Sequence, residues 1–426
     1  MIRKTVSRAA VALLAASAAF AALPASAAAP TPAAVVKHYV EIAQAKYQDS
    51  LVTAKVLDKA IDALIKTPSE ATLADARAAW IKARVPYQQT EVYRFGNPIV
   101  DEWEGKVNAW PLDEGLIDYV DAGYGNESDE NALYVANVIA NPKIKINGKT
   151  VNASKITPKL LRSLHEAGKV EANVATGYHA IEFLLWGQDL NGTGKGAGNR
   201  PFTDYDPKTC TNGNCDRRAA YLKAVSTLLV TDLTEMVADW KTGGAAAKAV
   251  SAKPKAGLSA ILTGMGSLSY GELAGERMKL GLLLHDPEEE HDCFSDNTFN
   301  SHLNDAIGIA AAYTGEYTRT DGTKLTGPSL SELVAAKDAA LDTEMKAKLD
   351  KTLAAMNAMA KRGETIEAYD QMIAEGNTEG NAAVQAAIDG LIDQTKSVER
   401  VVAALDLGKL EVEGSDSLDN PNAVFK

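Results

Sequence analysis

Cysteine is scarce in this sequence, with three residues among 426. These are too few for the cluster of thiolates that would select a soft metal ion. Cys210 and Cys215 flank the turn-forming residues TNGN, and in an oxidising compartment this close spacing predicts a local disulfide. A CxxxxC metal site is the alternative, although no histidine or second cysteine pair flanks it. Cys293 is left over, and we expect it to be buried or partly buried near the functional site.

Long apolar runs are also missing, except for one at the N-terminus. Arg3, Lys4 and Arg8 precede the run VALLAASAAFAALP, which is followed by ASA ending at Ala27. A basic start, a short apolar core and small residues at the end are typical of a secretory signal peptide, with cleavage near Ala27. A short membrane anchor is the alternative. No other segment is apolar enough to span a bilayer, so we expect a periplasmic or secreted chain without a transmembrane segment.

Basic residues are in the minority, with 44 lysines and arginines against 56 aspartates and glutamates. The formal net charge of −12 becomes more negative when the predicted signal peptide is removed, because that segment contains basic but no acidic residues. An acidic chain repels nucleic acid and anionic lipid, and it suits cations or basic partners. We therefore expect no nucleic-acid partner.

Clusters of β-branched residues are few, whereas alanine, the best helix former, is abundant. This composition predicts an all-α fold. About 400 mature residues exceed one ordinary hydrophobic core, which favours two domains. The stretch 187–214 is rich in Gly, Asn, Asp and Pro and marks the boundary between them. We therefore expect an N-terminal helical domain over residues 28–205 and a C-terminal helical bundle over residues 206–426.

Apolar spacing and capping residues predict where the helices lie. One helix is expected to run from Ser69 toward Phe95, with a kink at Pro86. The segment IKINGKTV is expected to form a short β-hairpin that turns at Asn147-Gly148. The other helices are expected over residues 31–66, from 158 onward, 167–186, 216–240, 257–284, 297–313, 329–361, 365–374 and 379–404.

Several catalytic signatures are absent from the sequence. There is no Gly-x-Ser-x-Gly motif, and GTGKGAG at residues 192–198 lacks both a preceding strand and the spacing of a phosphate-binding loop. The HExxH motif of metalloproteases is missing as well. His165-Glu166 begins such a pattern, but Lys169 occupies the position of the second histidine.

The stretch GYHAIEFLLWG, residues 177–187, places His179 three residues before Glu182 among apolar side chains. Residues three apart lie on the same side of a helix, so the two side chains can reach a common point. A neutral imidazole with a carboxylate is half of a transition-metal site. Gly177, two residues before His179, leaves room for close approach. A buried His–Glu pair held only by structural hydrogen bonds is the alternative.

A second polar set lies in GELAGERM, where Glu272 and Glu276 are four residues apart on an apolar helix. Like charges at this spacing destabilise a helix unless a cation lies between them. On an α-helical wheel Arg277 and Lys279 point elsewhere, so the cation is expected to be Arg84 or a metal ion. Solvent exposure of both glutamates, without a function, is the alternative.

A third set lies in ARVPYQQTEVYRF, where Arg84, Gln88 and Glu91 fall on one helical face. Arginine is always charged and can hold a carboxylate or an anionic substrate group through two hydrogen bonds. An Arg–Glu network within the helix is the alternative. In EEEHDCFSDNT most side chains are expected in a solvated turn, but His291 could point inward.

These segments together resemble the imelysin-like family, also called insulin-cleaving membrane proteases or iron-regulated protein A-like proteins. GYHAIEFLLWG resembles the GxHxxE motif of this family, and the resemblance covers most of the mature chain. The iron-regulated protein A subgroup is the most similar. The other similar blocks are ARVPYQQTEVYRFG, VNAWPLDEGLIDYV, CTNGNCDRRAAYL, GELAGERM and EEEHDCFSDNT.

The resemblance implies an exported protein of two helical bundles with a site at their interface, where His179 and Glu182 would lie. The family is linked to bacterial iron uptake and is also catalogued as a metallopeptidase family. A related helical domain occurs in periplasmic components of iron importers, which makes iron transporter components possible partners. Trp110, in one of the similar blocks, joins Arg84, Glu91 and His291 as a residue expected to bind the ligand.

Three functions remain open from the sequence. The leading hypothesis is a protein that binds iron, zinc or another divalent metal, or an iron-bearing ligand, through His179, Glu182, Glu272 and Glu276. The second is a metal-dependent peptidase, although the chain lacks the usual protease helix. The third is a metal-free interaction module with a buried polar network at the domain interface.

Overall fold

Helices dominate the structure, a computed structural model that describes residues 29–425. The all-α class is confirmed, and the expected signal peptide lies outside the described residues. The α-helices are α1 (Pro32–Lys66), α2 (Glu70–Gln88), α3 (Pro98–Asn108), α4 (Pro158–Leu164), α5 (Gly177–Trp186), α6 (Cys215–Asp239), α7 (Ala245–Ser251), α8 (Pro254–Ser267), α9 (Leu280–Leu284), α10 (Thr298–Thr314), α11 (Leu330–Ala335), α12 (Ala339–Thr365), α13 (Tyr369–Ile373), α14 (Thr378–Ala404) and α15 (Asp416–Asp419).

Three features interrupt the α-helical pattern. A π-helical segment, η6 (Leu268–Lys279), joins α8 to α9 without a break. Strands β1 (Lys143–Ile146) and β2 (Lys149–Asn152) form the expected hairpin, with Asn147 and Gly148 at positive φ in its turn. A second hairpin, β3 (Glu316–Thr318) and β4 (Lys324–Thr326), was not expected from the sequence.

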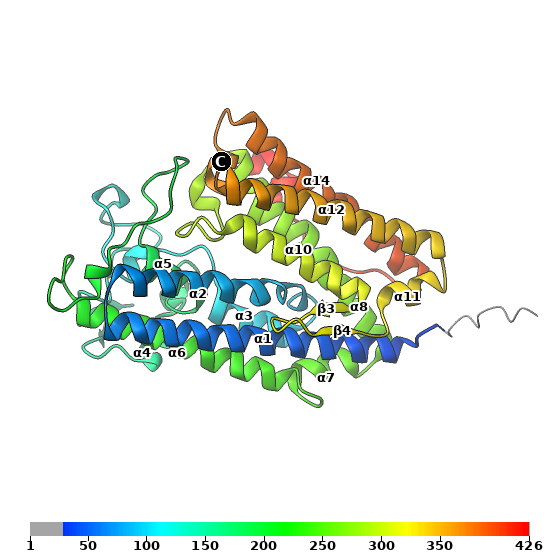
Figure 1. The fold of residues 1–426 in the computed structure, drawn as a ribbon, viewed down its shortest axis with the longest axis horizontal. Helices are drawn as coiled ribbons and strands as arrows, with labels where there is room; N and C mark the ends of the chain where they lie inside the picture. The colour runs from blue at the N-terminus through cyan, green and yellow to red at the C-terminus, as the bar shows by residue number, and fades with distance from the viewer. Residues whose placement is uncertain (1–28, 426) are drawn as a thin grey trace, which may run out of the picture.

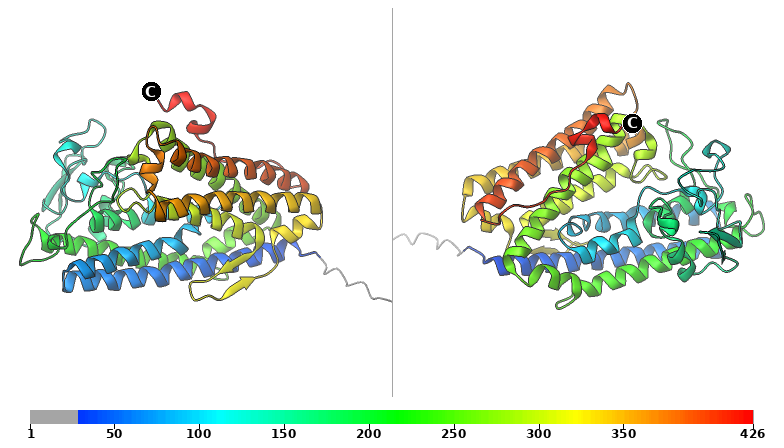
Figure 2. Two further views of the ribbon diagram at one scale, coloured as in Figure 1. Left: turned by 45° about the horizontal axis from the view of Figure 1, so that its top comes forward. Right: turned by 180° about the vertical axis from the view of Figure 1, so that it is seen from behind.

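The helices form two layers, which Figure 1 shows inclined to one another. Helices α1, α2 and α6 pack side by side in the first layer, and α5 packs on α2 and α6. Helices α10, α12 and α14, with η6, form the second layer. The two further views in Figure 2 show the same two layers, with the loops before and after α5 at one end.

The buried apolar side chains of both layers form one continuous cluster. Helix α6 follows the expected domain boundary in sequence, yet it packs on α1 in the first layer. The division into two domains at residues 205 and 206 therefore stays a prediction. Among the described residues, no helix combines the length and the apolar character needed to cross a membrane.

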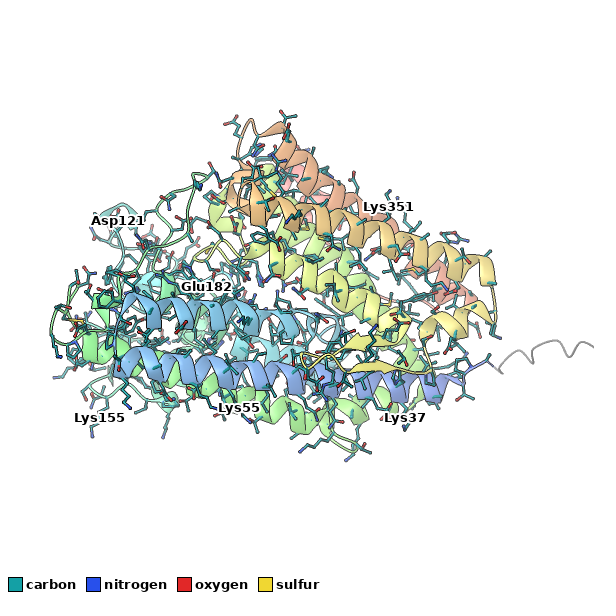
Figure 3. All side chains as sticks on the ribbon, in the orientation of Figure 1. Lys37, Lys55, Asp121, Lys155, Glu182 and Lys351 are labelled. Carbon is teal, nitrogen blue, oxygen red and sulfur yellow. A yellow bond between two sulfur atoms is a disulfide. The ribbon has the colours of Figure 1, made fainter. Side chains whose placement is uncertain are left out.

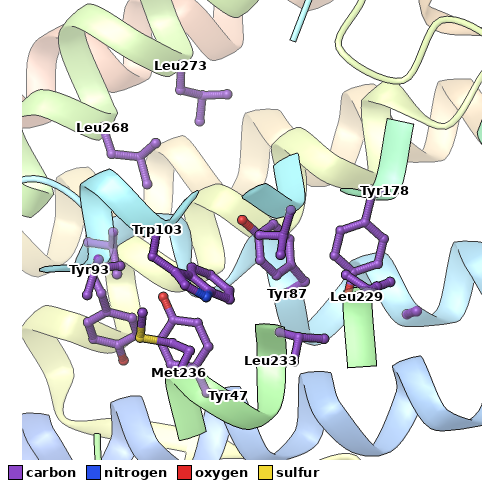
Figure 4. Close-up of a cluster of buried hydrophobic side chains, with 14 of the residues drawn as sticks. Tyr47, Tyr87, Tyr93, Trp103, Tyr178, Leu229, Leu233, Met236, Leu268 and Leu273 are labelled. Carbon is purple, nitrogen blue, oxygen red and sulfur yellow. The ribbon is translucent and has the colours of Figure 1, made fainter. Parts of the chain in front are cut away.

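Aromatic side chains fix how α2 and α5 pack in the first layer. The rings of Tyr87 and Tyr178 lie 4.8 Å apart, close to other buried aromatic residues (Figure 4). Trp80 on α2 donates a hydrogen bond from Nε1 to the carbonyl of Tyr178, at 2.9 Å. Buried aromatic pairs of this kind add about 0.5–1.5 kcal/mol to the free energy gained from burial. Because Arg84 lies between Trp80 and Tyr87, these contacts also place its side chain against α5.

Two helix boundaries differ from those expected. Helix α2 ends at Gln88 and does not continue to Phe95, because the N–H and hydroxyl of Thr90 both bond to the carbonyl of Tyr87 and close the helix there. Helix α5 begins at Gly177, not at residue 167. Positive φ angles at Glu166, Gly168 and Lys169 prevent a helix before it.

Gly177 opens α5 at a position that only glycine fits. Its φ is +88°, and a Cβ atom built there would lie 2.4 Å from the carbonyl oxygen of Val107 at the end of α3. The absence of a side chain at Gly177 therefore lets the two backbones approach closely. It brings the start of α5 against the end of α3.

The cysteines lie close to where they were expected. A disulfide joins Cys210 and Cys215, whose Cα atoms are 5.9 Å apart. Cys293 is half-buried and has no disulfide partner. Its pKa is raised well above the ordinary value, chiefly by burial, so its thiol stays protonated.

Candidate functional site

Helix α5 carries His179 and Glu182 into the interior between the two layers. His179 is 1% exposed and Glu182 is fully buried, and Figure 3 labels Glu182 near the centre of the molecule. Nδ1 of His179 lies 3.0 Å from Oε2 of Glu182. Nε2 of His179 is buried and has no hydrogen-bond partner among the described residues.

The segment between α9 and α10 closes this interior from the second layer. Ser295 donates two hydrogen bonds to Oε1 of Glu182, from its N–H at 3.1 Å and from its hydroxyl at 2.6 Å. His291 packs edge-on against His179, with ring centroids 4.7 Å apart. Trp110 also packs against His291, with ring centroids 5.8 Å apart. Its Nε1 donates a hydrogen bond to the carbonyl of Glu290.

Arg84 on α2 supplies the positive charge of the site. It is fully buried and bonds to both carboxylate oxygens of Asp292, with Nη2 2.7 Å from Oδ1 and Nε 3.4 Å from Oδ2. Its Nη1 donates to Oδ1 of Asn108 at 2.5 Å. A guanidinium can only donate, so Nδ1 of His291, 3.3 Å from Nη2, is an acceptor.

Asp292 is the most heavily bonded carboxylate of the site. Besides Arg84, it accepts from Nδ2 of Asn297 at 2.8 Å and from the hydroxyl of Ser301. Burial acts to raise the pKa of Asp292, but the charge of Arg84 and the hydrogen bonds from Ser301 and Asn297 together hold the pKa below the ordinary value. Asp292 is therefore an ionised carboxylate in a buried ion pair.

The two histidines of the site are neutral at ordinary pH. Burial, followed by the charge of Arg84, lowers the pKa of His179 to about 3. Burial also lowers the pKa of His291 well below its ordinary value. In contrast, burial and the nearby Asp292 raise the pKa of Glu182 well above its ordinary value. Neutral imidazoles are the form that binds metal ions.

His179, His291 and Asp292 have the spacing of metal ligands. Each offers one ligand atom, and these three atoms all lie within 4.8 Å of one another. All three residues are buried. Within residues 29–425, no other group of three His, Cys, Asp or Glu side chains meets this distance.

Glu272 and Glu91 belong to a separate buried network around Arg277. Nη2 of Arg277 lies 2.6 Å from Glu272 and 2.8 Å from Glu91, and Nη1 lies 3.3 Å from Asp305. The expectation that Arg277 points away from Glu272 is wrong. In the π-helical segment η6, hydrogen bonds run over five residues, so Arg277 lies one turn from Glu272.

The structure thus brings together only some of the residues expected at the site. Arg84, His179, Glu182 and His291 meet in one buried cluster, with the half-buried Trp110 at its edge. Glu91 and Glu272 pair with Arg277 instead, and the side chain of Glu276 is exposed. The intrahelical pair between Arg84 and Glu91, which was the alternative to ligand binding, is not formed.

Sequence reasoning missed Asp292, Asn108 and Ser295. Asp292 directly follows His291 in EEEHDCFSDNT, but its acidic neighbours made it resemble a solvated turn. Asn108 lies in VNAWPLDEGLIDYV, one of the segments that resembled the family. For Asp292 and Asn108, the only indication of a role at the site was that their segments resemble the family. Residue types alone do not tell which of several polar side chains points inward.

A family model described as imelysin (Peptidase_M75) matches residues 43–398 of this chain. The chain belongs to the imelysin family. The resemblance inferred from GYHAIEFLLWG and the other segments is therefore confirmed. In this imelysin, the matched residues include every side chain of the buried cluster.

Two relatives of this imelysin carry the same description. Iron-regulated protein A of Synechococcus elongatus is 34% identical over 83 residues, which are 19% of this chain and 21% of that protein. The match thus spans about a fifth of the length of that curated relative. A crystal structure from Parabacteroides distasonis, described as an iron-regulated protein A precursor, has a TM-score of 0.62 and 20% identity over 89% of this chain and 97% of its own. At this identity it shows that the fold is shared.

Proposed function

We propose that this imelysin is an exported protein that binds iron or another divalent first-row metal in the cluster of His179, His291 and Asp292. The observation that carries the proposal is the buried group of three ligand atoms within 4.8 Å. Nδ1 of His179 lies 4.0 Å from Oδ1 of Asp292, and Nδ1 of His291 lies 3.5 Å from the same oxygen. Two imidazole nitrogens and a carboxylate oxygen suit iron, manganese or zinc.

Glu182 is proposed to orient His179 and not to bind the metal itself. Its Oε2 contacts Nδ1 of the ring, while Ser295 occupies its other oxygen. A carboxyl group hydrogen-bonded to one nitrogen of a histidine ring fixes the tautomer and the orientation of the ring. The spacing of three residues between His179 and Glu182 serves this contact within α5.

Arg84 limits which ligand the cluster can accept. Its Nη2 lies between Oδ1 of Asp292 and Nδ1 of His291, so a bare metal ion would compete with the guanidinium for both. A guanidinium also binds carboxylates and other anions strongly. We therefore propose that the metal arrives with an anion, and that Arg84 binds this anion when it releases Asp292.

The names of the relatives support a link to iron. Two proteins described as iron-regulated protein A share sequence or fold with this chain. Together with the apolar run that precedes Ala27, they support a role in bacterial iron uptake outside the cytoplasm. Components of an iron transporter are then the expected partners.

Peptidase activity is the alternative that the description of the family suggests. The enclosure of the site opposes it, because Arg84, His179 and Asp292 are each at most 1% exposed and a polypeptide could not reach them without separation of the layers. Incubation with unfolded peptides, with and without a chelator, distinguishes the two. Cleavage that a chelator abolishes and that His179→Ala removes would favour the peptidase.

Calorimetric titration with Fe²⁺ under anaerobic conditions, and with Zn²⁺, tests the binding proposal. One equivalent should bind to the chain, and His179→Ala should weaken binding at least tenfold. His38→Ala, on α1 and outside the cluster, serves as the matched control and should bind as the unmodified chain does. Binding weaker than about 1 mM, or unchanged binding in His179→Ala, would remove the proposal.

A further inference from the structure

A second group of acidic side chains surrounds a small cavity beside the candidate site. The volume of the cavity is about 10 Å³, which is room for roughly one water molecule or ion. Four segments that are far apart in sequence meet there. The carboxyl groups that line it are Glu114, Asp189, Glu288, Glu290 and Asp370.

None of these five carboxyl groups pairs with a lysine, arginine or histidine of residues 29–425. Asp370 at the start of α13 is only 2% exposed, yet neither of its oxygens has a hydrogen-bond partner there. Burying a carboxylate without a partner is costly. Asp370 lines a cavity with room for an ion, and a cation bound there would be the partner that its carboxyl group lacks.

The pKa values of two carboxyl groups in the cavity reflect the cost of burying them. Burial, with repulsion from Asp189 adding to it, raises the pKa of Asp370 to about 7. Burial likewise raises the pKa of Glu114 to about 7, with repulsion from Glu288 adding to it. A bound cation would offset both effects and favour the ionised carboxylates.

We infer that this acidic cavity binds one hard divalent cation of the calcium and magnesium class, separate from the cluster at His179. The inference rests on the unpartnered oxygens of Asp370 and on the fact that all the acidic groups lining the cavity are carboxyl groups, which offer only oxygen to a metal ion. Hard cations take carboxylate oxygens and water, and calcium accepts irregular arrangements of six to eight ligands. Because no three of these carboxyl groups lie within 4.8 Å of one another, the segments that carry them would have to close on the cation.

The cation would join the two layers next to the candidate site. Asp370 lies on α13, whereas Asp189 lies three residues after the end of α5 and Glu114 lies in the segment between α3 and β1. Glu290 is followed at once by His291 and Asp292. A cation bound here would therefore fix the segment that carries two residues of the neighbouring cluster.

Titration with Ca²⁺, followed by calorimetry and by thermal unfolding, tests the inference. The purified chain should bind one Ca²⁺ with a Kd on the order of 0.1–1 mM, the range of extracellular calcium sites, and its Tm should rise. Asp370→Asn should weaken binding at least tenfold and abolish the rise in Tm. Asp350→Asn, which changes an exposed carboxylate on α12, is the matched control and should change neither.

The variant His179→Ala separates this inference from the proposed function. It should lose Fe²⁺ and Zn²⁺ binding but keep Ca²⁺ binding, whereas Asp370→Asn should show the reverse. Should Asp370→Asn fail to fold, Asp189→Asn in the half-buried loop replaces it with the same expectation. Equal Ca²⁺ affinity in the unmodified chain and the folded variant, or no Ca²⁺ binding at about ten times the expected Kd, would overturn the inference.

Discussion

Arg84 sets the charge balance of the buried cluster. It is the cation that faces Asp292, and both residues are completely removed from solvent. An ion pair in such a place is sensitive to the loss of one partner, because the other charge is then buried alone. The identity of residue 84 should therefore affect both stability and the affinity for a metal ion.

Arg84→Gln should lower the free energy of unfolding by about 3–5 kcal/mol, because Asp292 is left without its partner. Urea denaturation measures the change. Arg77→Gln removes another arginine of α2 that bonds only to carbonyl groups, and it should cost less. The double variant Arg84→Gln/Asp292→Asn should recover much of the loss. Equal losses for Arg84→Gln and Arg77→Gln would contradict the importance of the pair.

His302 on α10 should make stability depend on pH. Burial, with the charge of Arg277 next in importance, lowers its pKa to about 3 in the folded protein. In the unfolded chain the ring takes up a proton below about pH 6.5, so its contribution to stability falls as the pH drops from 6.5 toward 3.

The comparison of His302→Gln with the unmodified chain isolates this effect from the acidic groups, whose raised pKa values act in the opposite direction. The unmodified chain should lose up to about 1.4 kcal/mol per pH unit relative to the variant between pH 6 and 4. Urea denaturation at each pH provides the measurement. A difference that stays constant with pH would show that the folded ring takes up a proton normally.

At the scale of elements, the start of α5 depends on one glycine. Gly177→Ala should lower the free energy of unfolding by about 2–4 kcal/mol, because it combines a strained φ with a clash against Val107. Gly148→Ala, in the turn between β1 and β2, also has a positive φ but meets no atom within 4 Å. This control should lose only the part due to strain. Similar losses in both would mean that the contact with α3 does not matter.

Helix content and most helix positions could be predicted from the sequence, because alanine content and apolar spacing act locally. The boundaries of α2 and α5 could not. They depend on Thr90 and on positive φ angles after Leu164, and neither has a strong local signal. The π-helical segment was the most consequential omission, because it alone determines that Arg277 faces Glu272.

The sequence predicted a buried polar site on the helix of His179, but it did not predict which other residues complete the site. The pattern of His179 and Glu182 among apolar residues indicated a buried polar pair. Which distant side chains would meet them depends on tertiary packing. The pairing of Arg84 with Asp292 joins residues 208 apart in sequence, and no periodicity in either segment encodes that distance.

At the scale of the whole molecule, the continuous core has a consequence for unfolding. Side chains of both layers form one apolar cluster, and α2 of the first layer contacts α10 of the second. Calorimetry should therefore show one cooperative transition, and a fragment of residues 206–426 should not fold alone because α6 would lose α1. Two separate transitions would indicate instead that the expected domains are independent.

Enclosure also determines how quickly the cluster could exchange its contents with solvent. His179, His291 and Asp292 are buried, so an ion in solution cannot reach them by diffusion alone. Entry and exit would have to wait for a transient separation of α5 from the segment that precedes α10. A tightly held occupant would then leave at a rate set by the motion of the polypeptide, and a partner that pulls these two elements apart would control delivery without touching the occupant itself.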